Sequence, residues 1–411
     1  MKPSLYATNT PKAFWRLVQV PGVLPSQWSV AQTTAAKSLL PVLLDTQSTA
    51  DLRLDQILGE GQFGAEHWQL GLARRLYYDL KPLLPRWFTR LLRRAYNQPA
   101  TANFPLGWPI EERYAHFQWE CMRQMLILLD KASIPFIHFW PEGHRFAFVL
   151  THDIESAEGQ AYVRAVADLE ESLGFRSSFN FVPERYPVDH GLMQELRQRG
   201  FEIGVHGLKH DGKLFSSREE FNRRVGSINQ YLKEWNAIGF RAPLTHRQPE
   251  WMQALEIEYD LSFFDTDPYE PIPGGTMSIW PFELGHFVEL PYTLVQDHTL
   301  TAVLRNKTPR LWLQKVKFIQ NYCGMVLVNT HPDYLRAADT WMVYVEFLQE
   351  MKKIRDFWPS LPRDVARWWQ ARAEVESIDS LPGAVLSQVR VSGEDLVIEP
   401  LSEDREGAVT E

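Results

Sequence analysis

The sequence contains little cysteine: Cys121 and Cys323 are the only two among 411 residues. Two cysteines so far apart exclude a disulfide framework and a zinc cluster built from thiolates. The sequence also lacks any run of 18 or more apolar residues, and its first 24 residues lack the uninterrupted apolar core of a signal peptide. We therefore expect a cytoplasmic protein.

An excess of positive charge is missing as well. The net charge is −8, which argues against a generally basic nucleic-acid binder, so no nucleic-acid partner is expected. The local exception is the stretch RWFTRLLRRAYN at 86–97, which predicts an amphipathic helix with arginines on one side. This basic helix could dock on the rest of the protein or rest on an anionic membrane surface. The sequence does not indicate an oligomeric state.

From about residue 145 the sequence alternates between short apolar strands and amphipathic helices. This alternation predicts parallel strands joined by helical crossovers, and therefore an α/β barrel or a doubly wound sheet. We divide the chain into a largely helical N-terminal extension (1–144), a catalytic domain (145–336), C-terminal helices with a hairpin (337–401) and an acidic tail (402–411).

Ionisable residues gather where the predicted strands end. In parallel α/β proteins the carboxyl ends of the strands carry the active site, because the loops there converge on one mouth. The residues at these ends are Asp153, His206, Arg241, Asp265 and His331.

The stretch VHGLKH places His206 and His210 four residues apart, directly after a strand. Two imidazoles at this spacing share one face of a helical turn and could both bind one cation, although such a pair is more often structural. A catalytic zinc site also needs a third ligand, often a carboxylate. The stretch LTHDIE offers Asp153 and Glu155, which face the same side of an extended chain. The alternative is that these acids are solvated loop charges.

The other strand ends fit the same picture. Arg241 could hold a free carboxylate and keep its pKa low, or form an ordinary salt bridge. His331 could act as a general acid, or be a hydrogen-bonded structural histidine. Either Asp265 or Asp267 could orient His331. In the insert at 278–300, rings and polar groups could contact a sugar or simply pack in the core. These candidates are Trp280, Phe282, Tyr292, Asp297 and His298.

Taken in order, these segments resemble the polysaccharide deacetylase family, whose members share the NodB homology domain and belong to carbohydrate esterase family 4. The resemblance covers about residues 145–335 and rests on five segments in the family's order. They are LTHDIE, HGLKH, the Arg-x-Pro of RAP at 241–243, FFDTDP and LVNTH.

The resemblance implies a distorted (β/α) barrel with one divalent metal ion, usually zinc, and hydrolysis of N-acetyl or O-acetyl groups on sugars. Glu155, His206 and His210 would bind the metal, and a water on the metal would be the nucleophile. Asp153 would be the general base, held by Arg241, and His331 would protonate the leaving amine. Beyond these roles, we place Asp265 in the catalytic set and expect Pro243 and Asp267 to contact the substrate.

The sequence departs from the family pattern at one ligand. The common first motif has two adjacent aspartates, whereas Ile154 follows Asp153 here and Glu155 takes the ligand position with one more methylene. Two alternatives therefore stay open beside an acetyl-sugar hydrolase. One is hydrolysis of another small amide on the same fold, and the other is a catalytically weak glycan-binding or scaffolding protein of polysaccharide assembly.

Overall fold

The structure is a computed structural model that describes residues 4–18, 20, 22–39, 54–64, 67–68, 104–375, 377–393 and 395–401. The predicted basic helix at 86–97 and the predicted acidic tail at 402–411 lie outside these residues. Within the described part, no helix has both the length and the apolar character needed to cross a membrane.

A curled sheet, parallel except for β7, which pairs antiparallel with β8, forms the centre of the molecule. Parallel ladders join β2 to β3 and then run in order through β4, β5, β6 and β8, while β9 also pairs with β2. Two further parallel bridges, Phe264–Tyr292 and Leu294–Val328, connect the end of β6 to β9 through the segment after β8. They close the ring, and the predicted distorted (β/α) barrel is confirmed. The strands are β2 (Phe146–Ile154), β3 (Ser177–Phe181), β4 (Glu202–His206), β5 (Gly239–Arg241), β6 (Tyr259–Asp260), β7 (Phe282–Leu284), β8 (Phe287–Glu289), β9 (Met325–Thr330) and β10 (Phe357–Pro359).

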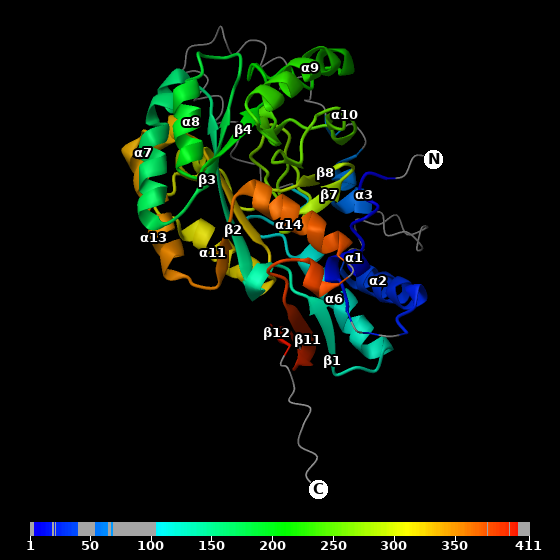
Figure 1. The fold of residues 1–411 in the computed structure, drawn as a ribbon. Helices are drawn as coiled ribbons and strands as arrows, with labels where there is room; N and C mark the ends of the chain where they lie inside the picture. Colours follow the sequence, from blue (N-terminus) through cyan, green and yellow to red (C-terminus); the bar gives the residue numbers. More distant parts are fainter. Residues whose placement is uncertain are drawn as a thin grey trace.

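Amphipathic helices cover the outside of this barrel, as Figure 1 shows for α7, α8 and α13. Their ends follow local sequence signals: the side chains of Ser156 and Ser217 cap α7 and α9, and Gly174 ends α7 in the left-handed conformation. The helices are α7 (Ala157–Leu173), α8 (His190–Gln198), α9 (Arg218–Glu234), α10 (Pro249–Met252), α11 (Arg310–Asn321), α12 (Pro332–Leu335), α13 (Ala338–Lys353) and α14 (Pro362–Glu374).

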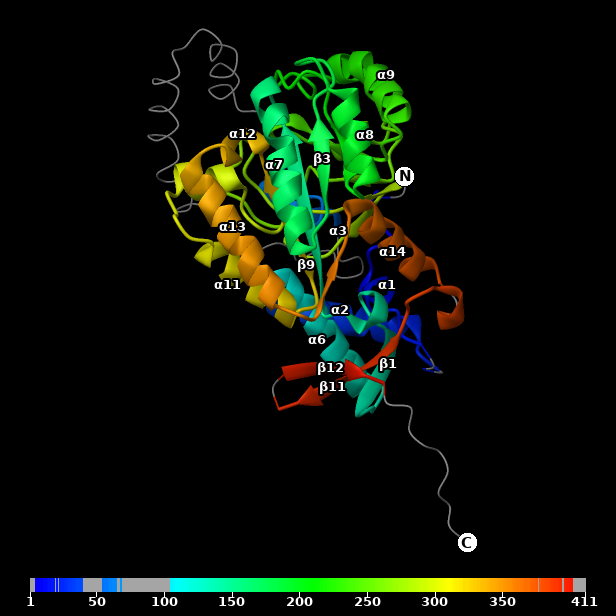
Figure 2. The same ribbon diagram turned by 60° about the vertical axis from the view of Figure 1, so that its left-hand side comes forward.

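A second, three-stranded sheet combines a strand from the N-terminal range 1–144 with a hairpin from the C-terminal range 337–401. The strand β1 pairs antiparallel with β11, and β11 pairs with β12 in the hairpin that the sequence predicts. In Figure 2, β3 points away from this sheet, which lies at the opposite end of the barrel. The ranges 1–144 and 337–401 therefore meet in one sheet. Its strands and the N-terminal helices are β1 (Ser133–Ile137), β11 (Leu386–Ser392), β12 (Asp395–Pro400), α1 (Pro11–Trp15), α2 (Pro25–Leu39), α3 (Leu54–Ile57) and α6 (Arg113–Leu128).

Candidate active site

Asp153 lies near the carboxyl end of β2, a strand buried along all nine residues. Its Oδ1 accepts hydrogen bonds from Asn180 Nδ2 (3.0 Å) and Arg241 Nη1 (3.2 Å), and its Oδ2 accepts one from Asn329 Nδ2 (2.9 Å). Burial would raise the pKa of Asp153, but the positive charge of Arg241 and the nearby histidines outweighs burial and lowers it. Asp153 is therefore an ionised carboxylate held in one orientation.

His206 ends β4 and presents one free ring nitrogen to the barrel mouth. Its Nδ1 lies 3.1 Å from the backbone oxygen of Arg241, so Nδ1–H donates there and Nε2 is left unprotonated. Nε2 is buried, makes no hydrogen bond with any described residue and lies 4.0 Å from Asp153 Oδ2. Burial lowers the pKa of His206 to about 4, which keeps the imidazole neutral at physiological pH. A neutral imidazole with a free nitrogen is the form that binds metals.

His210 reaches the same place from a loop instead of a helical turn, and on this point the sequence interpretation was wrong. Gly207 (φ 61°) and His210 (φ 51°) both adopt left-handed backbone conformations, which bend the chain back toward β4. The two imidazole rings lie 5.1 Å apart. Pro243 packs against this bend, because a Cβ on residue 207 would lie 2.3 Å from Pro243 Cγ. Pro243 therefore shapes the loop from Gly207 to His210, which we call the histidine loop.

Glu155, His206 and His210 could together hold a metal ion. One ligand atom from each residue lies within 4.8 Å of the other two. Glu155 Oε1 lies 2.9 Å from His210 Nε2, so the extra methylene does not keep this carboxylate away from the histidines. Burial would raise the pKa of Glu155, but His210 outweighs it and the pKa is lowered. Two imidazoles and one carboxylate, with the buried Nε2 of His206 unpaired among the described residues, fit a divalent cation.

His331 follows β9 on the other side of the mouth. Its Nδ1 lies 2.7 Å from Asp297 Oδ1, and its backbone N–H donates to Asp297 Oδ2 (2.8 Å). Its Nε2 is 3.9 Å from Glu155 Oε1. Burial would lower the pKa of His331, but Asp297 and the other carboxylates outweigh it and raise the pKa to about 10. His331 is thus a protonated imidazole whose Nε2 lies near Glu155.

The carboxylate that orients His331 is Asp297, not Asp265 or Asp267 as the sequence interpretation had it. Asp265 instead forms a buried ion pair with Lys315 of α11 (2.6 Å), and this contact takes its carboxylate away from the other site residues. Both oxygens of Asp267 accept hydrogen bonds, from the backbone of Tyr269 and from the hydroxyl of Tyr292. Asp297 was expected to contact substrate, and it is instead almost fully buried behind His331.

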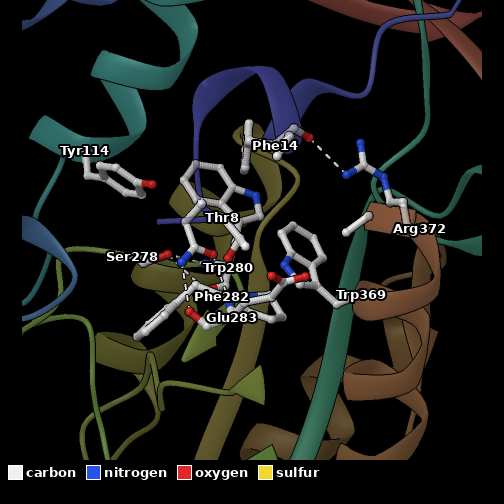
Figure 3. A pocket seen from close by; sticks show the side chains of 13 residues that line it. Thr8, Phe14, Tyr114, Ser278, Trp280, Phe282, Glu283, Trp369 and Arg372 are labelled. Atoms are coloured by element: carbon white, nitrogen blue, oxygen red, sulfur yellow. Dashed lines mark hydrogen bonds between the residues drawn. The ribbon is translucent and has the colours of Figure 1, made fainter. Parts of the chain in front are cut away.

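The aromatic candidates of the insert also take other roles. Trp280 is 1% exposed and donates its indole N–H to the backbone oxygen of Cys323. Figure 3 shows its ring in a small pocket beside Phe14, which belongs to the N-terminal extension. Tyr292 is also 1% exposed, with its hydroxyl bonded to Glu270 (2.9 Å), so neither ring offers a face to a sugar. His298 packs its ring against Tyr334, whose ring in turn contacts His331.

Two residues of the site, Asn180 and Asn329, are absent from the sequence interpretation. Each is a polar side chain inside an otherwise apolar strand, FNF and LVNTH, and that interruption is the signal that could have found them. The arrangement as a whole is a candidate metal centre with an ionised carboxylate on one side and a protonated imidazole on the other.

Comparison with known proteins gives distant structural similarities. No protein-family model matches the sequence, and no curated protein matches it. Among solved structures, a putative polysaccharide deacetylase from Mycobacterium smegmatis has 18% identity, with a TM-score of 0.44 over 57% of this chain and 93% of that one. Puue allantoinase has 14% identity and a TM-score of 0.45, again over 57% and 93%. A putative polysaccharide deacetylase involved in O-antigen biosynthesis from Bordetella bronchiseptica has 18% identity and a TM-score of 0.35 over 56% and 86%. Similarity this distant does not assign an activity.

Proposed function

We propose that this protein is a metal-dependent hydrolase that removes acetyl groups, chiefly N-acetyl, from a sugar or polysaccharide precursor. The observation that supports the proposal is the arrangement of five ionisable side chains around the mouth of the barrel. Glu155, His206 and His210 form a ligand set, with Asp153 next to it on one side and His331 on the other. A ligand set flanked by a base and an acid is suited to metal-assisted hydrolysis of an amide.

Glu155, His206 and His210 would hold a divalent cation, which we propose to be zinc because two imidazoles and a carboxylate suit it. The chemistry that such a cation supplies is Lewis acidity, which lowers the pKa of water and polarises a carbonyl oxygen. We further propose that the protein acts in the cytoplasm, as its sequence predicts.

Asp153 would accept the proton that the attacking water loses. Arg241, Asn180 and Asn329 hold both of its oxygens, so the carboxylate needs no reorganisation when the reaction begins. His331 would donate its Nε2 proton to the leaving nitrogen as the C–N bond breaks, releasing acetate and a free amine. The side chain of Asp297 contacts Nδ1 and holds the ring of His331 in one orientation throughout.

The test is release of acetate from N-acetylated sugars by purified protein loaded with zinc or cobalt. His206→Ala should lose bound metal and activity together, whereas Asp153→Asn should keep the metal and lose activity by several orders of magnitude. Metal content measured by mass spectrometry separates the two effects. A His206→Ala variant with full activity would contradict the proposal.

The same residues would also hydrolyse a non-sugar amide, because His331 protonates any amide nitrogen that reaches it. Parallel assays on acetylated sugars and on small linear and cyclic amides decide between these substrates. A purely scaffolding role predicts no tightly bound metal, so metal analysis tests that alternative directly.

A further inference from the structure

The segment between β6 and β7, residues 261–281, begins at the barrel mouth and is mostly buried. Every residue from 261 to 282 is buried except Tyr269, Pro271 and Pro273. The ring of Tyr269 meets the ring of Trp108 at 5.2 Å between centroids and 73° between planes. Trp108 is partly exposed and belongs to the N-terminal extension. Two parts of the chain far apart in sequence thus form one aromatic corner.

The N-terminal extension fixes this segment in place. Glu60 forms a fully buried bidentate ion pair with Arg247 (2.6 and 2.8 Å) and accepts the backbone N–H of Gly275 (2.5 Å). Gln62 Nε2 donates to the backbone oxygen of Gly275 (3.1 Å). On the other side, Thr266 Oγ1 donates to the backbone oxygen of Gly107 (2.7 Å). The segment is therefore held on both sides of Tyr269, at Thr266 and at Gly275.

Trp108 is held by a separate set of contacts. Glu111 is 2% exposed and accepts the backbone N–H of Gly107 (2.6 Å), while its carboxylate pairs with Arg113 (2.6 Å). Residue 107 must be glycine at this turn, because a Cβ there would lie 2.4 Å from the backbone oxygen of Ile110. The backbone that carries Trp108 and Tyr269 is therefore fixed by hydrogen bonds. Such preorganisation lowers the entropy cost of binding a ligand.

The corner adjoins the candidate active site through a short chain of contacts. Glu270, next to Tyr269, accepts hydrogen bonds from Gln296 Nε2 and Thr245 Oγ1 (2.7 Å each). Gln296 precedes Asp297, the carboxylate that holds His331, and Thr245 lies on the loop that follows Arg241. The segment carrying Tyr269 is thus packed against two of the loops that form the mouth.

We propose that Trp108 and Tyr269 form a carbohydrate subsite that stacks a sugar ring adjacent to the one carrying the acetyl group. Flat, partly exposed rings suit the C–H face of a pyranose, and a corner of two rings fixes its orientation. The proposal rests on the proposed function for the nature of the ligand. It extends that function by making an oligosaccharide, rather than a single sugar, the preferred substrate, and by giving the N-terminal extension a part in binding.

The test measures binding by calorimetry on the Asp153→Asn protein, with N-acetylglucosamine and its β-1,4-linked tetramer as probes. The tetramer should bind at least tenfold more tightly than the monosaccharide. Trp108→Ala or Tyr269→Ala should each remove roughly five- to tenfold of the tetramer's affinity and leave the monosaccharide unchanged. Trp108→Phe should retain most of the affinity, because it keeps a flat ring.

A matched control is available on the outer helices. Trp341 of α13 and Tyr162 of α7 make an edge-on pair of similar geometry, 5.5 Å and 76°. Trp341→Ala should therefore leave binding of both probes unchanged. Circular dichroism confirms that each variant is folded.

The outcomes separate the subsite from the proposed function. Equal affinity for the two probes, or no loss in Trp108→Ala and Tyr269→Ala, overturns the subsite even if the wild type releases acetate. Tight tetramer binding that these variants weaken supports the subsite even if no acetate is released, and in that case the proposed function fails alone.

Discussion

Both carboxylate oxygens of Asp153 accept hydrogen bonds from asparagine amides, and Arg241 adds its charge to one of them. Arg241 also donates through Nη1 to the amide oxygen of Asn329. Asn329 therefore touches the proposed base and the arginine that holds it. Replacing it leaves Asp153 Oδ2, a buried acceptor, without the amide donor, which costs about 1–3 kcal/mol. Arg241 Nη1 keeps its hydrogen bonds to Thr151 and Asp153.

At the residue scale we expect Asn329→Leu to lower kcat/KM by about tenfold or more while zinc stays bound, since Asn329 touches none of the proposed ligands. Steady-state kinetics on metal-loaded protein measure the effect. Asn321→Leu, on the exposed end of α11, serves as the control and should behave like the wild type. Unchanged kcat/KM in Asn329→Leu would show that the amide does not position Asp153.

A second prediction concerns the histidine loop. Gly207→Ala should abolish zinc binding, because an alanine must adopt a positive φ and its Cβ would overlap Pro243. Gly226→Ala is the matched control, since a Cβ on this residue of α9 meets no atom of the described residues within 4 Å. That change should stabilise the protein by about 0.5–1 kcal/mol. Metal content and thermal unfolding distinguish the two variants, and stoichiometric zinc in Gly207→Ala would contradict the prediction.

The sequence predicts the charged members of the site better than the neutral ones. Asp153, Glu155, His206, His210, Arg241 and His331 stand at strand ends, and the geometry brings them together. Asn180 and Asn329 stand inside strands, where only their contacts reveal a role. The partner of His331 could not be read from the sequence either, because Asp265, Asp267 and Asp297 differ only in what their loops place next to them.

At the scale of elements, the ion pair between Glu60 and Arg247 joins the N-terminal extension to the loop after β5. Both side chains are 0% exposed, and the guanidinium also lies over the rings of Trp68 and Phe264. Such a pair contributes little net stability when intact but is costly to break from one side, because the remaining charge is buried alone.

We therefore expect Glu60→Leu to lower the free energy of unfolding by about 3–5 kcal/mol. The chain offers a matched control: Arg367 and Glu258 form a bidentate pair of the same kind with side chains 57% and 43% exposed. Glu258→Leu should cost about 1 kcal/mol or less. Denaturant titration compares the two, and equal losses would mean that the buried pair is not a clamp.

Elements that follow one another along the chain are predictable from periodicity, whereas their distant partners are not. The alternation of strand and helix from residue 145 gives the barrel, because each crossover is local. By contrast, β1 pairs with a strand that begins about 250 residues later in the chain, and Glu60 meets Arg247 across a separation of 187 residues. The local sequence pattern around β1 or Glu60 does not indicate which distant segment it contacts.

For the whole molecule, Glu202 makes stability depend on pH. It lies at the start of β4, where it accepts hydrogen bonds from the Tyr259 hydroxyl (2.8 Å) and the Arg363 backbone N–H (3.2 Å). Burial raises its pKa from 4.5 to about 7, so the folded protein binds a proton that the unfolded chain releases. The stability that protonated Glu202 gives the folded state is fully present below pH 4.5, and it is lost as the pH rises through about 7.

The expected loss between these pH values is on the order of 3 kcal/mol in the free energy of unfolding. Glu202→Gln should flatten this part of the pH profile, because glutamine carries no proton to lose. Thermal unfolding at intervals from pH 4.5 to 8 measures the slope, with the exposed Glu250→Gln as the control. An identical slope in Glu202→Gln and wild type would assign the dependence to other groups.

The pairing of β1 with β11 also bears on how the protein is made. All residues of the candidate active site lie between 153 and 331, so they are synthesised before β11, which begins at Leu386. Until then the edge of β1 that β11 covers presents open backbone hydrogen-bonding groups, a template for pairing with another copy. The strand β11, Leu386–Ser392, is thus what closes that edge and removes the template for pairing with another copy.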